Sequence, residues 1–100
     1  MTAILRIEHR VADFERWRQA FDNDPIGRER GGVRRYRIMR ANDDEEYVLI
    51  DLEFDSPNAA EAFLASLRQM WTRVDVMYDP RARVALLAEE RALVANPTPA

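Results

Sequence analysis

His9 is the only histidine in this sequence, and so the only side chain whose ordinary pKa lies near neutrality. It is therefore the first candidate for removing a proton from a substrate. A catalytic base needs a partner that orients its ring, and a lone His has none that the sequence reveals. The simpler interpretation is that His9 ends a strand and hydrogen-bonds the loop that follows. Residue type alone is compatible with either role.

Three aromatic residues could serve a binding pocket. The hydroxyl of Tyr36 could act on a substrate beside His9, and Trp71 and Trp17 could form pocket walls. Both tryptophans fall in apolar stripes at helical spacing, which favours packing in the core. Tyr36 fits a pocket and simple packing equally well. The candidate catalytic residues are thus His9 and Tyr36, with Trp71 as a substrate contact.

A second group of candidates is charged. Asp51 interrupts an apolar run at residues 47–54, and Arg35 and Arg37 alternate with other residues at 33–40. Alternation along extended chains predicts a sheet face that carries three positive and three negative groups. Its members are Arg6, Glu8, Arg35, Arg37, Asp51 and Glu53. We expect an ion-pair network that sets strand register and partner choice. The alternative is a polar site in which Arg35, Arg37 and Asp51 bind substrate.

Other polar clusters are weaker candidates. Arg28 and Arg30 lie beside a Gly-Gly pair and could bind an anion, although a solvated loop is the simpler interpretation. The acidic residues 43–46 lack the spacing of a calcium loop and fit a hairpin tip. One His without any Cys does not build an ordinary transition-metal site, and the sequence has no Gly-rich phosphate loop. Any chemistry is expected to need no cofactor and no metal.

Length and composition restrict the class of protein. One hundred residues, 47% of them hydrophobic and 33% charged, predict a single folded domain over residues 1–93 and a disordered tail at 94–100. The net charge is −3, and the fifteen arginines are interleaved with acids, which argues against nucleic-acid binding. No apolar run is long enough for a membrane span, and the N-terminus does not resemble a signal peptide. A cytoplasmic protein is expected.

The elements that must position these residues follow from periodicity. Strands are predicted at residues 3–9, 33–40, 47–54 and 83–88, with one helix after Asp13 and another after Ser56. The order strand, helix, strand, strand, helix, strand predicts a ferredoxin-like α+β fold. Its antiparallel sheet has the fourth strand beside the first, then the third and the second. Both helices cover one face.

The face away from the helices should also be covered. It is expected to retain apolar side chains between its charges, and such a surface promotes association. These side chains are Ile4, Val33, Met39, Tyr47 and Leu49. The sequence therefore predicts a homodimer that pairs two sheets.

Two motifs resemble a known family. They are Val-x-Asp-Phe-x-x-Trp-x-x-Ala-Phe at residues 11–21 and Ser-Pro-x-x-Ala-Glu-Ala-Phe at 56–63. Together they resemble the dimeric α/β-barrel superfamily, which includes antibiotic-biosynthesis-monooxygenase-like proteins and some polyketide cyclases. The resemblance spans about residues 3–92. It implies two sheets closed into a barrel across a two-fold axis.

The resemblance also implies a function. Cofactor-free oxygenases of this superfamily use Asn, Trp and Tyr or His around a quinol-like substrate. Trp71, Tyr36 and His9 are the nearest residue types here, and no Asn lies near Trp71 in the sequence. The heme-degrading branch needs an axial His on the second helix, which this chain lacks. The expectation is a small-molecule-binding protein, in the manner of a cofactor-independent monooxygenase or cyclase acting on an aromatic or polyketide-type metabolite. The alternative is a non-catalytic dimeric module. A cavity of roughly 300 Å³ or more beside these three residues would favour the first.

Overall fold

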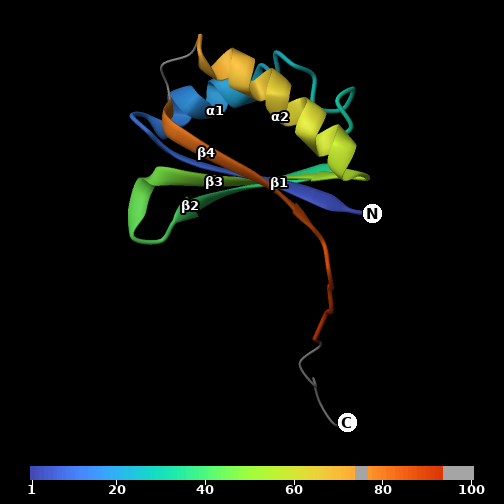
Figure 1. The fold of residues 1–100 in the computed structure, drawn as a ribbon. Helices are drawn as coiled ribbons and strands as arrows, with labels where there is room; N and C mark the ends of the chain where they lie inside the picture. The colour runs from blue at the N-terminus through green and yellow to red at the C-terminus, as the bar shows by residue number, and fades with distance from the viewer. Residues whose placement is uncertain (74–76, 94–100) are drawn as a thin grey trace, which may run out of the picture.

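The chain forms six elements in the predicted order (Figure 1). The computed structural model describes residues 1–73 and 77–93. The element bounds are β1 Ala3–Val11, α1 Phe14–Asp22, β2 Arg35–Ala41, β3 Asp44–Phe54, α2 Pro57–Trp71 and β4 Met77–Leu86. This order confirms the ferredoxin-like α+β architecture. The tail predicted to be disordered, residues 94–100, lies outside the described residues.

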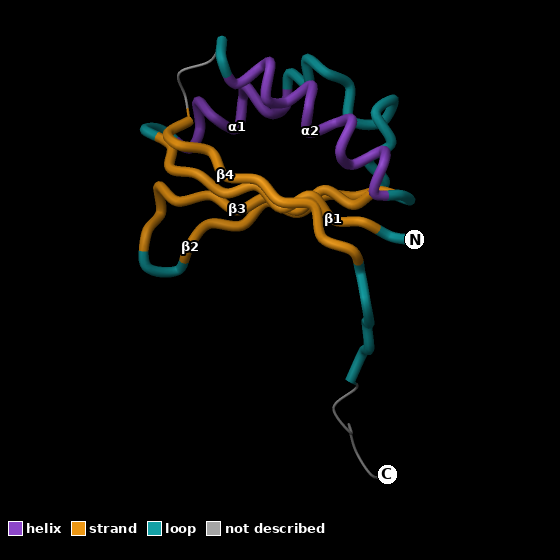
Figure 2. The backbone as a smooth tube through the Cα atoms, viewed as in Figure 1, coloured by secondary structure: helices purple, strands orange, loops and turns teal. Residues whose placement is uncertain are grey.

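The four strands make one antiparallel sheet in the order β2-β3-β1-β4, as predicted. Figures 1 and 2 show both helices on the same face of this sheet, with no helix against the other face. Side chains alternate between the two faces along each strand. Each strand therefore supplies one set of side chains to the layer beneath the helices and another to the open face.

Both helices begin where capping chemistry predicts. The Asp13 carboxylate accepts a hydrogen bond from the Arg16 backbone N–H, and the Ser56 hydroxyl accepts one from the Ala59 N–H. Each cap satisfies an amide that the first helical turn leaves without an intrahelical partner. Pro57 follows Ser56 at a position where its missing N–H costs nothing. These caps fix where α1 and α2 start, and so which of their faces meets the sheet.

The core lies between the helices and the sheet. The apolar stripe of α2 is buried against the inward side chains of β1 and β3, and burial of each large apolar side chain contributes about 1.5–3 kcal/mol. Its buried members are Ala60, Phe63, Leu64 and Leu67, packed with Leu5, Ile7, Val48, Ile50, Leu52 and Phe54 from the sheet. From α1 only Trp17 is buried. The α1 side of this layer is therefore less tightly filled, which leaves room for a cavity.

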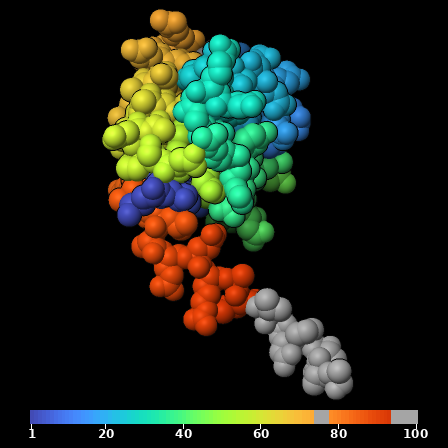
Figure 3. Space-filling model, turned by 90° about the vertical axis from the view of Figure 1, so that its right-hand side faces the viewer, coloured from blue at the N-terminus to red at the C-terminus, as the bar shows by residue number. Residues whose placement is uncertain are grey.

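The segment between α1 and β2 packs between the two helices, as Figure 3 shows for the cyan residues beside the yellow start of α2. Its path depends on Gly32, whose φ of 99° suits glycine, and on Gly31, which lies against the ring of Phe63. The position of one residue in this segment differs from the expectation. Val33 is buried in the core instead of lying on the open face, because the chain turns at Gly32 before β2 begins at Arg35.

Replacing Gly31 with Ala is expected to destabilise the fold by about 1–3 kcal/mol, because its Cβ would lie 2.5 Å from Phe63 Cδ1. Urea unfolding of the variant and the parent measures this loss. In a Phe63→Leu background, where the ring is gone, the same substitution should cost clearly less. An equal cost in both backgrounds would show that the contact with the ring is not the cause.

The last strand starts earlier than predicted, at Met77 instead of residue 83, and ends at Leu86 instead of residue 88. Asp79 and Pro80 suggested a break, but β4 is an edge strand, where a proline without an N–H is tolerated. Asp79 has a φ of 50°, and the pairing with β1 shifts between Glu8 and Arg10. β4 therefore runs along almost the whole of β1. Neither helix within residues 1–73 and 77–93 has the length and apolar character that a membrane span requires.

Candidate functional site

A cavity of about 420 Å³ lies between the sheet, the two helices and the loop that follows α1. This volume is in the range of small-molecule sites. Aromatic and aliphatic side chains form most of its walls, among them Ile7, Trp17, Phe21, Ile50, Leu67 and Trp71. Its polar lining residues are His9, Asn23, Asp24, Arg28 and Arg73. The site thus combines an apolar interior with few polar groups, which is typical of pockets for organic ligands.

His9 lines this cavity from β1 and is only 2% exposed. Its Nδ1 lies 3.2 Å from the Arg10 carbonyl oxygen, which only accepts hydrogen bonds, so Nδ1 carries the proton and donates. Nε2 of the neutral ring is then a free acceptor. No buried side-chain nitrogen or oxygen of the described residues lacks a hydrogen-bond partner. Within residues 1–73 and 77–93 no hydrogen-bond partner of Nε2 is found, and His9 lines the cavity.

Burial keeps this imidazole neutral. It lowers the pKa of His9 below the ordinary 6.5, and the hydrogen bond to the Arg10 carbonyl offsets that effect only in part. The ring is therefore unprotonated at neutral pH and able to accept a proton from a ligand. The backbone carbonyl supplies the orienting partner that the sequence did not reveal.

His9 packs against one aromatic ring and shares the cavity with others. Its ring centroid is 5.7 Å from that of Trp17, and Trp17 lies 5.3 Å from Phe21. These tilted contacts have the spacing at which aromatic pairs attract each other. Trp17 and Phe21 belong to α1. Trp71 is the last residue of α2 and also lines the cavity. A planar ligand in the cavity would lie among several ring faces.

The loop after α1 contributes Arg28, one of the arginines that line the cavity. Arg28 is not a solvated loop residue, since its side chain is only 17% exposed. Its guanidinium lies 3.8 Å from the ring centroid of Phe21 and donates to the Phe21 carbonyl oxygen at 2.7 Å. The Asp24 carboxylate accepts from the Arg28 backbone N–H at 2.8 Å, which holds the loop in place. Arg30, the other candidate in this loop, is exposed.

Asn23 was missed by reasoning from the sequence. It is distant from Trp71 along the chain, yet both residues line the same cavity. Asn23 is the C-cap of α1, and the chain turns there toward Arg28. Only the path of this loop brings an amide, a tryptophan and a histidine together. The Asn-Asp-Pro sequence marked a turn, which was the available signal, but it did not show where the turn points.

Tyr36 takes a different place from the one predicted. It lies on the helix-covered side of β2, with its ring centroid 5.1 Å from Phe21, but it is 42% exposed and is not part of the cavity lining. It also lies beneath the Arg28 guanidinium, 5.2 Å away. His9 and Trp71 thus line the same cavity, whereas Tyr36 contacts Phe21 and Arg28 outside the cavity lining.

The remaining predicted site residues lie on the opposite face of the sheet. Asp51, only 6% exposed, accepts from Arg6 through both oxygens at 2.7 and 2.8 Å and from Arg37 at 3.4 Å. Arg37 is directly across from Asp51, as predicted, and Arg35 is across from Glu53 with 3.5 Å between their charged atoms. Arg35, Arg37 and Asp51 therefore cannot share a site with His9.

The predicted balance of three positive and three negative groups on this face is wrong. β4 starts at Met77 and so includes Arg81, which pairs across from Glu8; Arg83, within the predicted strand, pairs across from Arg6. Cross-strand partners lie on the same face of a sheet. Two further arginines therefore belong to the open face. Glu8 is held by the Tyr47 hydroxyl, which donates to its carboxylate at 2.6 Å.

Solved structures of other proteins share the fold of this chain. No family model and no curated protein matches this sequence. Among solved structures, SnoaB, a cofactor-independent oxygenase from Streptomyces nogalater solved as an asparagine-to-alanine variant, is similar with a TM-score of 0.72 and 12% identity, covering 89% of this chain and 95% of SnoaB. The chain shares its fold with SnoaB and with a protein described as dimeric ferredoxin-like.

Two further structures agree with this fold. A Nitrosomonas europaea protein with the provisional description antibiotic biosynthesis monooxygenase has a TM-score of 0.64 and 15% identity, covering 84% of this chain and 88% of its own. A dimeric ferredoxin-like protein from an uncultured marine organism has a TM-score of 0.66 and 10% identity, covering 93% of each chain. At such identities the likeness concerns the fold alone, so function must be argued from the cavity.

Proposed function

We propose that the cavity binds a planar aromatic or polyketide-type metabolite and that His9 acts there as a general base. The reaction would be of the cofactor-independent monooxygenase or cyclase type. One observation carries this proposal: a neutral histidine, oriented through Nδ1 and with no partner for Nε2 among the described residues, lines a cavity walled by tryptophan and phenylalanine rings. The likeness of the fold to SnoaB, which is described as a cofactor-independent oxygenase, supports the same class.

Each part of the cavity has a chemical task in this proposal. The rings hold the carbon skeleton of the ligand, and His9 Nε2 accepts the proton of a phenolic hydroxyl. The resulting anion lies beside a newly formed imidazolium, while the Asn23 amide and the Arg28 guanidinium offer further donors at the loop. An electron-rich phenolate can then react with molecular oxygen, or its ring carbon can attack a carbonyl of the same molecule.

We also propose that the chain forms a homodimer through the open face of its sheet. That face retains partly buried apolar residues between its charges, namely Ile4, Met39, Tyr47 and Leu49. Similar folds include proteins described as dimeric. A second copy would cover this apolar surface. The substitution of Asp51 described in the Discussion tests this arrangement.

Filling the cavity should abolish ligand binding. Ala20 lines the cavity from α1, and Ala20→Phe would place a ring in the space the ligand needs. We expect the affinity for a tricyclic hydroxyanthraquinone such as alizarin, measured by quenching of tryptophan fluorescence, to fall about tenfold or more. Ala65→Phe on α2 is the matched control, because Ala65 is exposed and does not line the cavity. Equal losses in both variants would contradict the site.

A non-catalytic dimeric module remains the alternative function. It predicts that aromatic ligands of this class do not bind the parent protein at all, and that Ala20→Phe stabilises the fold without any effect on ligands. The size of the cavity and the open Nε2 of His9 favour the enzymatic proposal, because a purely structural core would be expected to fill this space.

A further inference from the structure

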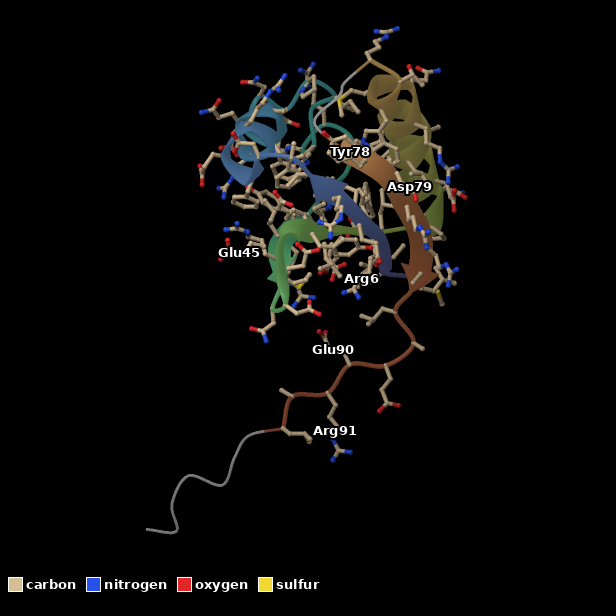
Figure 4. All side chains as sticks on the ribbon, turned by 90° about the vertical axis from the view of Figure 1, so that its left-hand side faces the viewer. Arg6, Glu45, Tyr78, Asp79, Glu90 and Arg91 are labelled. Atoms are coloured by element: carbon tan, nitrogen blue, oxygen red, sulfur yellow. The ribbon has the colours of Figure 1, made fainter. Side chains whose placement is uncertain are left out.

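The open face of the sheet has a hollow of its own, of about 590 Å³. It shares no lining residue with the cavity beneath the helices. Its charged lining consists of four arginines and two carboxylates, namely Arg6, Arg37, Arg81, Arg83, Glu8 and Asp51. Figure 4 shows the labelled Arg6 side chain at the sheet, away from the helices. The hollow is thus a separate, strongly basic feature of the molecule.

Both carboxylates of the hollow already have partners. Arg6 and Arg37 occupy the two oxygens of Asp51, and the Tyr47 hydroxyl donates to Glu8. Within the described part of the chain, the ion-pair contact of Arg81 is a long one of 3.6 Å to Asp79, and both of those side chains are largely exposed. Such a pair contributes little.

Arg83 has no ion pair or hydrogen bond from its side chain to any of the described residues. Across the sheet it lies next to Arg6, another cation. Four arginines against two carboxylates leave a formal surplus of two positive charges in the hollow. The positive charge of Arg83 is therefore available to a ligand.

Pairing with a second copy would not remove this surplus. In a two-fold dimer the same face of each chain meets its counterpart, so equal surpluses are added instead of cancelled. Like charges brought together away from water are costly unless a counter-charge accompanies them. A small anion would supply that counter-charge, and the planar fork of each arginine matches the geometry of phosphate and carboxylate oxygens.

We propose that this hollow binds a small multivalent oxyanion, of the phosphate or dicarboxylate class, with Arg83 as its main contact. Arg81 and the outward N–H groups of Arg37 complete the site, while Arg6 stays engaged with Asp51. This anion site is independent of the function proposed for the cavity, because it lies on the other face of the sheet.

Titration calorimetry at low ionic strength tests the site, with inorganic phosphate and malonate as separate probes. We expect saturable binding of one anion per chain for at least one probe, and Arg83→Gln should weaken it about tenfold or more. Arg35→Gln is the matched control, since Arg35 lies on the same face, is paired with Glu53 and does not line the hollow. Comparing the affinity for phosphate with the affinity for malonate shows which of the two ligand classes the hollow prefers.

Two results would overturn the proposal. One is the absence of saturable binding of either probe to the parent protein. The other is an equal loss in Arg83→Gln and Arg35→Gln, which would indicate a general dependence on net charge instead of a specific site. If Arg83→Gln dissociates a dimer in sedimentation experiments while the parent binds no anion, the partner of Arg83 is an acidic residue of a second copy and the anion site does not exist.

Discussion

Replacement of His9 by Gln is expected to lower turnover of a phenolic substrate by about 10²–10⁴-fold, the usual contribution of a positioned base. Gln keeps a polar side chain of similar length but does not accept a proton at neutral pH. Oxygen uptake with a tricyclic hydroquinone, corrected for oxidation without protein, measures the effect. Alizarin affinity should change little, because the rings that hold the ligand are untouched. A variant that retains full turnover would remove His9 from the mechanism.

The pH dependence gives a second readout of His9. Its pKa lies below 6.5 in the folded protein, so turnover should stay constant as pH falls past 6.5 and should decline only below the lowered pKa. Stability follows the same direction. The stability that depends on the neutral ring is fully present above the unfolded value near 6.5 and is lost as pH falls through the folded pKa. Both effects should be absent in His9→Gln.

Replacement of Asp51 by Ala is expected to destabilise the protein by about 3–5 kcal/mol, the range for breaking a buried ion pair. The carboxylate accepts three hydrogen bonds, two from Arg6 and one from Arg37. Its removal leaves both guanidinium groups without this carboxylate, and Arg6 is also directly across from Arg83. In the single chain these arginine side chains are 50% and 70% exposed. The full loss is therefore expected only if a second copy covers the face.

Urea unfolding together with sedimentation tests this expectation. Glu53→Ala is the matched control, because Glu53 is on the same strand and face but has only a 3.5 Å contact with the exposed Arg35. It should cost less than about 1 kcal/mol. If Asp51→Ala costs no more than this control and the parent sediments as a monomer, the proposed covering of the sheet face is wrong.

Asp51 should also govern stability in acid. The hydrogen bonds from Arg6, more than any other cause, hold its pKa below the ordinary 3.8. The stability that depends on its charge is fully present above that unfolded value and is lost as pH falls through the folded pKa. The parent should therefore lose more stability over this range than Asp51→Ala does.

Alternation and capping were sufficient to predict most of the fold. The side chains of β1 and β3 divide between the two faces as their spacing requires, and Asp13 and Ser56 cap the two helices. The exception is β4, because Asp79 and Pro80 are strand breakers in most contexts and are accommodated here by an irregular edge. This error removed Arg81 from the expected open face; Arg83 lies within the predicted strand but was not counted on that face, and the basic hollow was missed with them.

The site was less predictable than the fold. His9 and Trp71 could be proposed from residue type and spacing, and they do line one cavity. Asn23 and Arg28 could not be placed, because they depend on an irregular loop whose course is set by tertiary contacts such as that of Gly31 with Phe63. Alternation put Tyr36 on the correct face, but it carries no information about which neighbour separates a side chain from a cavity.

The irregular start of β4 also affects how copies of this chain could polymerise. A regular edge strand offers a row of unpaired N–H and C=O groups that can recruit a strand from another molecule and begin fibril growth. On β4, Pro80 has no N–H to offer, and the left-handed backbone at Asp79 interrupts the row of donors and acceptors. This end of the β4 edge is therefore a poor template for the addition of a strand from another molecule.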